Sequence, residues 1–139
     1  MATRSRIAIE NVDNTVTSIY CHFDGYVSHN GKILHNHFQD REKVEDLIAL
    51  GAISFLKENI EPTDKHSFNN PQEGVTVAYH RDQGEDFNQS QHTNVDDFFD
   101  DALSQFRYAY LFTLDGKWLV SSGGPVVELR FALKGEDVL

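Results

Sequence analysis

Cysteine is almost absent from this sequence, in which Cys21 stands alone. A single thiol cannot close a disulfide within the chain, so the fold depends on its apolar core. The first residues include two arginines, but no apolar stretch follows them, which argues against a secretory signal peptide. Together these absences favour a cytoplasmic protein.

Long apolar runs and basic residues are also scarce. No run approaches the roughly 18 residues that a transmembrane helix needs, so we expect no membrane partner. There are 12 Lys and Arg against 22 Asp and Glu, which gives a net charge of −10. Because nucleic-acid binding usually needs a basic patch, we expect no direct nucleic-acid binding. The acidity either keeps the protein soluble or offers an acidic face to a basic partner.

The sequence does contain enough bulky apolar material for a folded core. Apolar residues make up 40% of the 139 residues, and aromatic residues make up 12%. A chain of this length has about the usual size of one domain, and it buries roughly two thirds of the surface that its unfolded form exposes. We therefore expect residues 1–139 to form a single α+β domain.

Strand patterns occur in several segments. Apolar and polar residues alternate over residues 4–10, and residues 16–23 are rich in β-branched and aromatic side chains, so we expect an antiparallel hairpin. Residues 75–80 alternate as well. Residues 108–114 and 117–121 flank an Asp-Gly pair, which suits a tight turn, and they predict a second hairpin.

Helix patterns are clearest at residues 94–106, where an asparagine suits the N-cap and apolar residues recur at helical spacing. Residues 29–38 and 41–50 predict two more helices, and residues 55–57 a short turn. Residues 126–133 alternate like a strand. A helix that begins just before them, at a proline, is the competing interpretation, and we favour the strand.

The order of these elements favours an α+β fold rather than alternating βαβ units. Hairpins dominate, and the polar residues 61–74 and 81–93 are expected to be loops. We therefore predict a single mostly antiparallel sheet of about five strands, with helices packed on one face. Residues 4–10 would be an exposed edge strand, through which a homodimer could pair.

A glycine-containing segment between the second strand and the first helix is the first candidate site. A helix start with glycine and lysine attracts anions. The spacing of residues 25–32 does not fit a nucleotide P-loop, because five residues separate the glycines and isoleucine follows the lysine. A weaker anion or ligand site remains, as does a simple turn. Its residues would be Tyr26, Ser28, His29, Asn30, Gly31 and Lys32.

An acidic cluster on the helix at residues 94–106 is the second candidate. It comprises Asp96, Asp97, Asp100 and Asp101. Such charge runs are usually solvated helix faces, but a long-range negative field also promotes docking to a basic partner. We therefore treat these residues as a candidate partner-binding acidic face.

Other chemistry has less support in the sequence. His29, His35 and His37 are close in sequence, but their spacing on a helix does not converge on one ion, so we expect no metal site there. Cys21 and His22 point to opposite faces of a strand, so the imidazole cannot activate the thiol. We identify no catalytic residues and no cofactor, and the sequence favours a protein that is not an enzyme.

The chain resembles a group of small tailed-phage proteins along most of its length. The resemblance lies in TSIYCHFDGY (residues 17–26), HNGKIL (29–34), KVEDLIALG (43–51) and YAYLF followed by GKW (108–118). Members usually read YCHWDGYP, and this chain has Phe23 and Val27 at the Trp and Pro positions. The group has no settled activity, so the resemblance implies a phage origin and no particular chemistry.

Three hypotheses follow from these observations. The first is a phage accessory protein that binds a host protein in the host cytoplasm without catalysis, in host takeover or anti-defence. The alternative is a nucleotide- or small-anion-binding protein, or an enzyme, that uses residues 25–32. The third is a DNA mimic, which requires carboxylates in a phosphate-like row.

Overall fold

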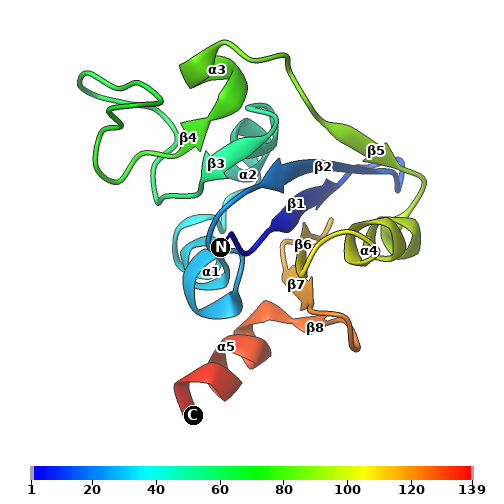
Figure 1. Ribbon diagram of the computed structural model, residues 1–139. Helices are drawn as coiled ribbons and strands as arrows, with labels where there is room; N and C mark the ends of the chain where they lie inside the picture. Colours follow the sequence, from blue (N-terminus) through cyan, green and yellow to red (C-terminus); the bar gives the residue numbers. More distant parts are fainter. Residues whose placement is uncertain (1, 139) are drawn as a thin grey trace.

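The computed structural model describes residues 2–138, with side chains described for residues 2–134. A β-sheet runs through the molecule, and helices lie against it (Figure 1). The strands are β1 (Ser5–Glu10), β2 (Val16–Cys21), β3 (Ile53–Phe55), β4 (Val77–Ala78), β5 (Ser90–His92), β6 (Tyr108–Phe112), β7 (Trp118–Ser121) and β8 (Val127–Glu128). The helices are the π-helix η1 (Val27–Gly31), α1 (Lys32–His37), α2 (Arg41–Ile48), α3 (Tyr79–Gln83), α4 (Val95–Leu103) and α5 (Leu129–Val138).

The sheet has eight strands in the order β4-β3-β2-β1-β6-β7-β8, and β5 also pairs with β2. Both expected hairpins are confirmed, since β1 is antiparallel to β2 and β6 is antiparallel to β7. Strands β1 and β6, however, are parallel, as are β2 and β3. The α+β class is therefore confirmed, whereas the sheet is mixed and larger than the mostly antiparallel sheet of about five strands that the sequence predicted.

Strand β1 is a central strand, which corrects the prediction that residues 4–10 form an exposed edge. One side of β1 pairs with β2 and the other with β6, so that Ile7 lies between Ile19 and Tyr110. Its backbone hydrogen-bonding groups are therefore used within the sheet, and it cannot pair with a second copy. The edges of the sheet path are β4 and β8.

Helices cover both faces of the sheet, which corrects the expectation of one covered face. Helix α4 packs on one face, where Phe98, Phe99 and Ala102 meet Ala8 and Leu111. The opposite face carries the larger core, to which η1, α1, α2 and α5 contribute. Figure 1 shows α4 on one side of β6 and β7, and α1 and α5 on the other. Strands that are buried on both faces show a weaker alternation of apolar and polar residues. The sequence therefore gives little indication that the sheet is covered on both sides.

The aromatic residues of the second hairpin belong to this larger core. Tyr110 is fully buried, and Phe112 and Trp118 are almost so. The indole Nε1–H of Trp118 donates to the carbonyl oxygen of Phe38 at 2.8 Å. The predicted apolar ridge of α4 is also inside, because Phe98 is fully buried and Phe99 almost so.

Several element boundaries differ from those expected. Helices α2 and α4 are confirmed within residues 41–50 and 94–106. The expected helix at 29–38 begins earlier, as the π-helix η1, and continues as α1. Residues 126–133 combine both interpretations, because the two-residue strand β8 runs directly into α5.

The middle of the chain is less loop-like than its polarity suggests. The turn expected at residues 55–57 is wrong, since Phe55 ends strand β3. The strand expected at 75–80 shrinks to β4 and turns into α3, and the loop expected at 81–93 contains β5. These elements are short, and tertiary pairing rather than local preference decides them.

None of the helices among residues 2–138 is long and apolar enough to cross a lipid bilayer.

Candidate functional site

The first candidate segment, residues 25–32, leads from β2 into η1 and α1. Asp24, just before it, has a positive φ of 59°. Gly25 follows, and its N–H donates to the carbonyl oxygen of Thr3 at 2.9 Å. A Cβ atom on Gly25 would lie 2.9 Å from that oxygen and 2.9 Å from Cβ of Ser5. The glycine therefore lets the chain cross close to the start of β1. Its backbone N–H bonds to Thr3 and is not available to a ligand.

Two residues of this segment face the interior. Asn30 is fully buried, and its side-chain amide donates to Sγ of Cys21 and to the carbonyl oxygen of Phe23, at 3.3 Å each. Its backbone N–H donates to the carbonyl oxygen of Asp24. Gly31 is also buried, and a Cβ atom there would press on helix α5 at 3.1 Å. These two residues hold the fold together rather than facing solvent.

The remaining side chains, those of Tyr26, Ser28, His29 and Lys32, reach the surface. Asp24 lies among them. Its carboxylate accepts a hydrogen bond from the Tyr26 hydroxyl at 3.2 Å and lies 3.9 Å from Nε2 of His29. The negative charge of Asp24 raises the pKa of the Tyr26 hydroxyl. An anion bound here would meet that carboxylate, so the arrangement lends little support to nucleotide or anion binding.

The thiol of Cys21, beside this segment, is inaccessible and unreactive. It is fully buried, and burial raises its pKa to about 11, which outweighs the hydrogen bond from Asn30. The thiolate is the reactive form, and almost none is present near neutral pH. Cys21 therefore belongs to the core beneath η1.

Replacement of Tyr110 by phenylalanine tests how firmly this segment is held. The Tyr110 hydroxyl donates to the carbonyl oxygen of Gly25 at 2.6 Å in a buried position. Removing the donor leaves that oxygen unsatisfied, so we expect Tyr110→Phe to lower the free energy of unfolding by about 1–2 kcal/mol. Urea denaturation measures the change. Tyr26→Phe, at an exposed hydroxyl, should cost no more than a few tenths of a kcal/mol, and equal losses would contradict this account.

Helix α4 carries the second candidate, and its N-terminus is held by side chains. Oδ1 of Asn94 accepts the backbone N–H of Asp97 at 2.9 Å, which confirms the predicted N-cap. Oδ2 of Asp97 in turn accepts the backbone N–H of Thr93 at 2.9 Å. These bonds satisfy groups that a helix start leaves free, and they fix the direction of Asp97.

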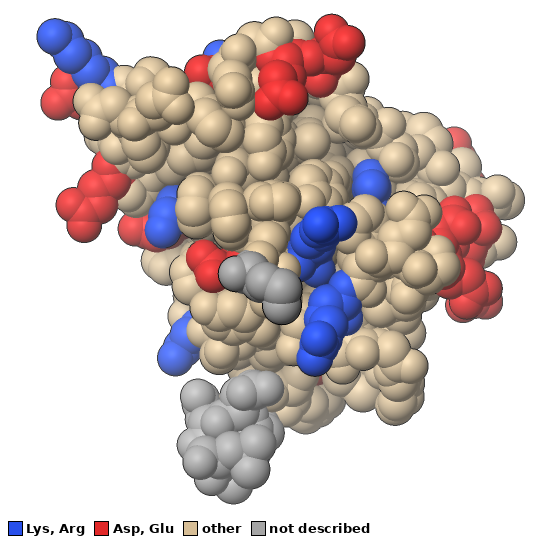
Figure 2. Space-filling view, in the orientation of Figure 1, with Lys and Arg blue, Asp and Glu red and all other residues tan. Residues whose placement is uncertain are grey.

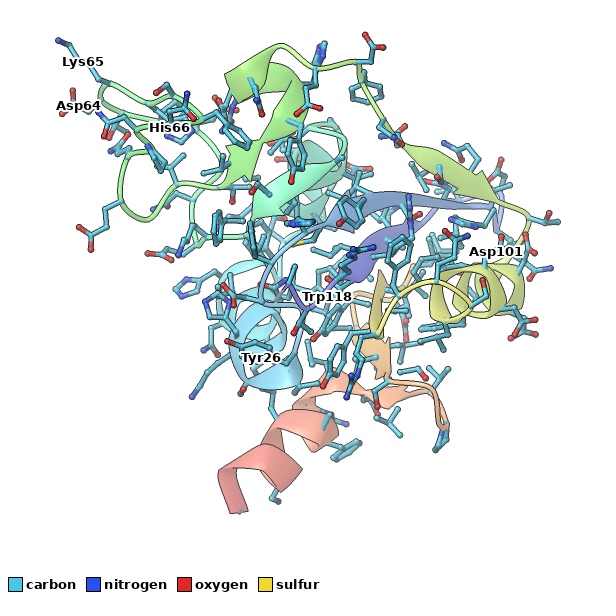
Figure 3. All side chains as sticks on the ribbon, in the orientation of Figure 1. Tyr26, Asp64, Lys65, His66, Asp101 and Trp118 are labelled. Carbon is cyan, nitrogen blue, oxygen red and sulfur yellow. The ribbon has the colours of Figure 1, made fainter. Side chains whose placement is uncertain are left out.

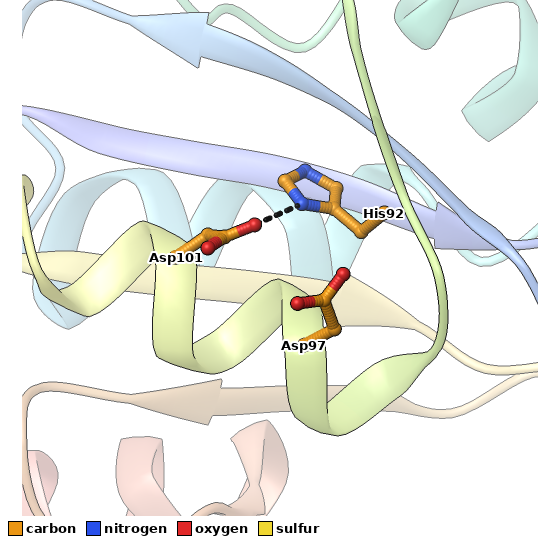
Figure 4. Close-up of side chains that lie close together, drawn as sticks. All are labelled: His92, Asp97 and Asp101. Carbon is orange, nitrogen blue, oxygen red and sulfur yellow. Dashed lines mark hydrogen bonds and ion pairs between the residues drawn. The ribbon is translucent and has the colours of Figure 1, made fainter.

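The four aspartates of α4 do not form one face. Asp96 and Asp100 border a groove of about 640 Å³ between α4 and the turn that contains Gly123 and Gly124. Asp97 and Asp101 lie near His92 of β5 (Figure 4). Adjacent helical residues point about 100° apart, which separates the two pairs. Figure 2 shows acidic side chains gathered at the margin of the molecule that corresponds to α4 in Figure 1.

The groove beside Asp96 and Asp100 has an apolar component. Phe99, Leu103 and Val126 also line it. Phe99 is almost buried, whereas Val126 is 43% exposed. Negative charge thus lies over apolar surface that a partner side chain can reach.

His92 links β5 to both α4 and the sheet. Its Nδ1 lies 3.1 Å from Oδ2 of Asp101, and its Nε2 lies 2.8 Å from Oγ of Ser18. Nε of Arg6 donates to the same Oγ at 2.9 Å. A carboxylate only accepts, so Nδ1 carries the proton, and the Ser18 hydroxyl donates to Nε2. The order Ser18, His92, Asp101 resembles a catalytic triad, but Ser18 is fully buried in the sheet, where no substrate reaches it.

Sequence reasoning missed His92 because its partners come from distant segments. Strand β5 is three residues long, and it places His92 opposite Val16 of β2. The only available signal was a histidine shortly before an acidic helix. Among the described residues, His92, Asp97 and Asp101 are the only group of three whose ligand atoms could hold one metal ion.

Sequence reasoning also missed an aromatic cleft near the β3–β4 edge. It has a volume of about 340 Å³ and is lined by His22, Phe23, Ser54, Phe55, Phe68, Pro71, Val77 and Tyr79. Phe23 stacks on Phe55 with ring centroids 4.5 Å apart. Phe68 and Pro71 belong to the polar segment 61–74, so the apolar wall is recognisable only once that segment folds over the sheet.

The segment at residues 61–74 is attached to α3 by His66. Nδ1 of His66 accepts the backbone N–H of Gln72 at 2.9 Å, so Nε2 carries the proton and donates to Asp82 at 3.0 Å. Both side chains are almost fully buried. Figure 3 labels His66 on this segment, far from Tyr26 and from Asp101, so the three regions are separate.

Comparison with known proteins adds no family or structural relative. The chain matches no protein-family model, no curated protein and no solved structure.

Proposed function

We propose that the chain is a phage-encoded accessory protein that binds a host protein in the host cytoplasm without catalysis. The observation that carries this proposal is the groove beside α4, where Asp96 and Asp100 border an apolar surface of Leu103 and Val126. The resemblance to small tailed-phage proteins supports the origin, and the net charge of −10 supports a basic partner.

The groove suits a segment that is basic on one side and apolar on the other. Exposed carboxylates speed the encounter with Lys and Arg, while desolvated apolar contacts supply most of the affinity. The volume of about 640 Å³ accommodates a few side chains rather than a whole domain. A short amphipathic segment of the partner is therefore the expected ligand.

The surroundings of possible nucleophiles support a non-catalytic role. Cys21 and Ser18 are fully buried, and the Cys21 thiol has a raised pKa. The carboxylates of Asp96 and Asp100 lie on the surface. Their exposure favours docking over acid–base chemistry, which needs a proton-transferring group positioned against a bound substrate.

Reversal of the groove charges tests the proposal. We expect Asp96→Lys together with Asp100→Lys to weaken binding of a synthetic helical peptide, with Lys and Arg on one face and Leu on the other, by about 10- to 100-fold. Fluorescence anisotropy measures the dissociation constant. The affinity of the unchanged protein should fall as salt is raised, because surface charges are screened.

A charge-matched variant separates the groove from the overall charge. Glu42 and Asp46 are exposed on α2 at the same spacing, so Glu42→Lys with Asp46→Lys changes the net charge equally. We expect this control to bind the peptide within about threefold of the unchanged protein, since only the long-range field differs. Equal losses in the two double variants would show that the groove is not the binding surface.

A further inference from the structure

We propose that His92, Asp97 and Asp101 form a binding site for a divalent transition metal ion, with Zn²⁺ as the preferred occupant. The imidazole and the two carboxylates each offer one ligand atom, and these atoms lie within 4.8 Å of one another. Figure 4 shows the histidine directed from β5 towards the two aspartates on α4. This site is distinct from the groove beside Asp96 and Asp100, so it stands apart from the proposed function.

The buried imidazole is what distinguishes this cluster from a solvated acidic helix face. The side chain of His92 is only 5% exposed, and its Nδ1 is directed at Asp101 rather than at solvent. Pairing of β5 with β2 and an edge-to-face contact with Phe98, at 5.2 Å between ring centroids, fix the ring. A nitrogen ligand is therefore already positioned, which reduces the entropy lost on binding an ion.

The two carboxylates lack a strong cationic partner. Asp97 and Asp101 are i,i+4 neighbours on α4, where like charges repel. Among the side chains of residues 2–134, the only basic partner of either carboxylate is His92, which contacts Asp101. The guanidinium of Arg6 instead contacts Ser18 and lies over the ring of Phe106. A bound cation would relieve this repulsion.

The spacing fits an ion after a small contraction. Zn²⁺ holds nitrogen and oxygen ligands at about 2.1 Å, which places the ligand atoms about 3–4 Å from one another. The side chain of Asp101 is 58% exposed, so a small shift of its carboxylate towards the ion displaces solvent and no packed side chain. One imidazole and two carboxylates leave at least one position for water, and the imidazole favours Zn²⁺ over Mg²⁺ or Ca²⁺, which prefer oxygen ligands.

Metal binding requires one proton to move. Nδ1 of His92 now carries the proton that it donates to Asp101, and this nitrogen must be bare to bind the ion. Loss of that proton to solvent and protonation of Nε2 leave a neutral ring. The Ser18 hydroxyl, which donates to Nε2 in the metal-free protein, turns its hydrogen away, and its Oγ accepts the new Nε2–H beside the N–H of Arg6. Ser18 then holds the ring from behind, as outer hydrogen-bond partners do in metal sites.

Thermal unfolding of the full chain with Zn²⁺ tests the site. We expect the Tm to rise by about 5–10 °C when free Zn²⁺ exceeds its dissociation constant about 100-fold, and Mg²⁺ at the same concentration to leave it nearly unchanged. Asp97→Asn and Asp101→Asn should each lower Zn²⁺ affinity at least 10-fold. Asparagine keeps an acceptor oxygen for Thr93 and for His92, so both variants retain the contacts that fold the helix start.

Matched variants on the same helix provide the control. Asp96→Asn and Asp100→Asn remove the same charge but lie outside the cluster, so their Zn²⁺ affinity should equal that of the unchanged protein. Co²⁺ should give visible absorption bands that Asp101→Asn abolishes. The proposal is overturned if Zn²⁺ produces no shift, or if the shift is the same in all four variants, which would indicate only scattered binding to surface histidines.

Discussion

Replacement of Phe98 by alanine is expected to lower the free energy of unfolding by about 3–5 kcal/mol. Phe98 is fully buried beneath α4, in the smaller core with Ala8, Val16 and Leu111. Its ring also meets that of Phe99 at 5.0 Å between centroids. Truncation removes buried apolar surface and leaves a cavity that the paired β-strands cannot close, so both terms oppose folding.

Urea denaturation followed by circular dichroism measures this loss. Phe87→Ala is the matched control, because Phe87 is 49% exposed and its truncation should cost well under 1 kcal/mol. A loss for Phe98→Ala no larger than that of the control would mean that α4 does not seal this face of the sheet. Packing of α4 against the sheet would then not explain how Asp96 and Asp97 are positioned.

Replacement of Asp82 by alanine is expected to cost about 2–4 kcal/mol at neutral pH. The Asp82 carboxylate is almost fully buried and accepts hydrogen bonds from His66, from Arg81 and from the backbone N–H of Ala78. Alanine would leave these donors without their acceptor. The segment at residues 61–74 would lose its attachment to α3, so proteolysis there should also accelerate.

The cost of Asp82→Ala should depend on pH in a defined direction. Burial alone would raise the pKa of the Asp82 carboxyl, but hydrogen bonds from Arg81, Ala78 and His66 together hold it below its usual value. A group whose pKa is lower in the folded state stabilises the fold fully above its unfolded pKa, about 3.9. This contribution is lost as the pH falls through the folded pKa, so the difference from the unchanged protein should shrink below about pH 4.

Asp64→Ala is the control for this second experiment. Asp64 is exposed on the same segment, and among the described residues its carboxylate accepts only the neighbouring backbone N–H of Lys65. Its removal should change the free energy of unfolding by less than about 0.5 kcal/mol at any pH tested. A pH-independent loss for Asp82→Ala would contradict the role assigned to the carboxylate charge.

The parts of the fold that could be predicted from the sequence are those with local signals. The second hairpin turns at Asp115-Gly116, where Gly116 has a φ of 80° that only glycine adopts readily. Helix α4 begins after Asn94 because its side chain accepts an N–H that would otherwise lack a partner. In each case a few neighbouring residues contain the whole reason for the structure.

The parts that sequence reasoning missed depend on partners far along the chain. The parallel pairing of β1 with β6 joins Ile7 to Tyr110, and no local pattern states which strands meet or in which direction. Strands β3, β5 and β8 have two or three residues each, too few for an alternation to be recognised. They exist because longer neighbours offer hydrogen-bonding edges.

The candidate site divides in the same way. The sequence identified the acidic residues of α4, and helical geometry alone separates Asp96 and Asp100 from Asp97 and Asp101. The sequence could not show which residues each pair of aspartates faces. His92 reaches Asp101 only through the pairing of β5 with β2, and the groove exists only because the Gly123–Gly124 turn lies beside α4.

Affinity capture from host-cell lysate, read by quantitative mass spectrometry, tests the central claim most directly. The unchanged protein is compared with Asp96→Lys/Asp100→Lys and with the charge-matched Glu42→Lys/Asp46→Lys. We predict that one host protein is enriched by the unchanged chain and by the α2 variant, and that the α4 variant loses it. Recovery of no protein above background, or equal recovery by all three chains, would contradict a host-binding groove beside α4.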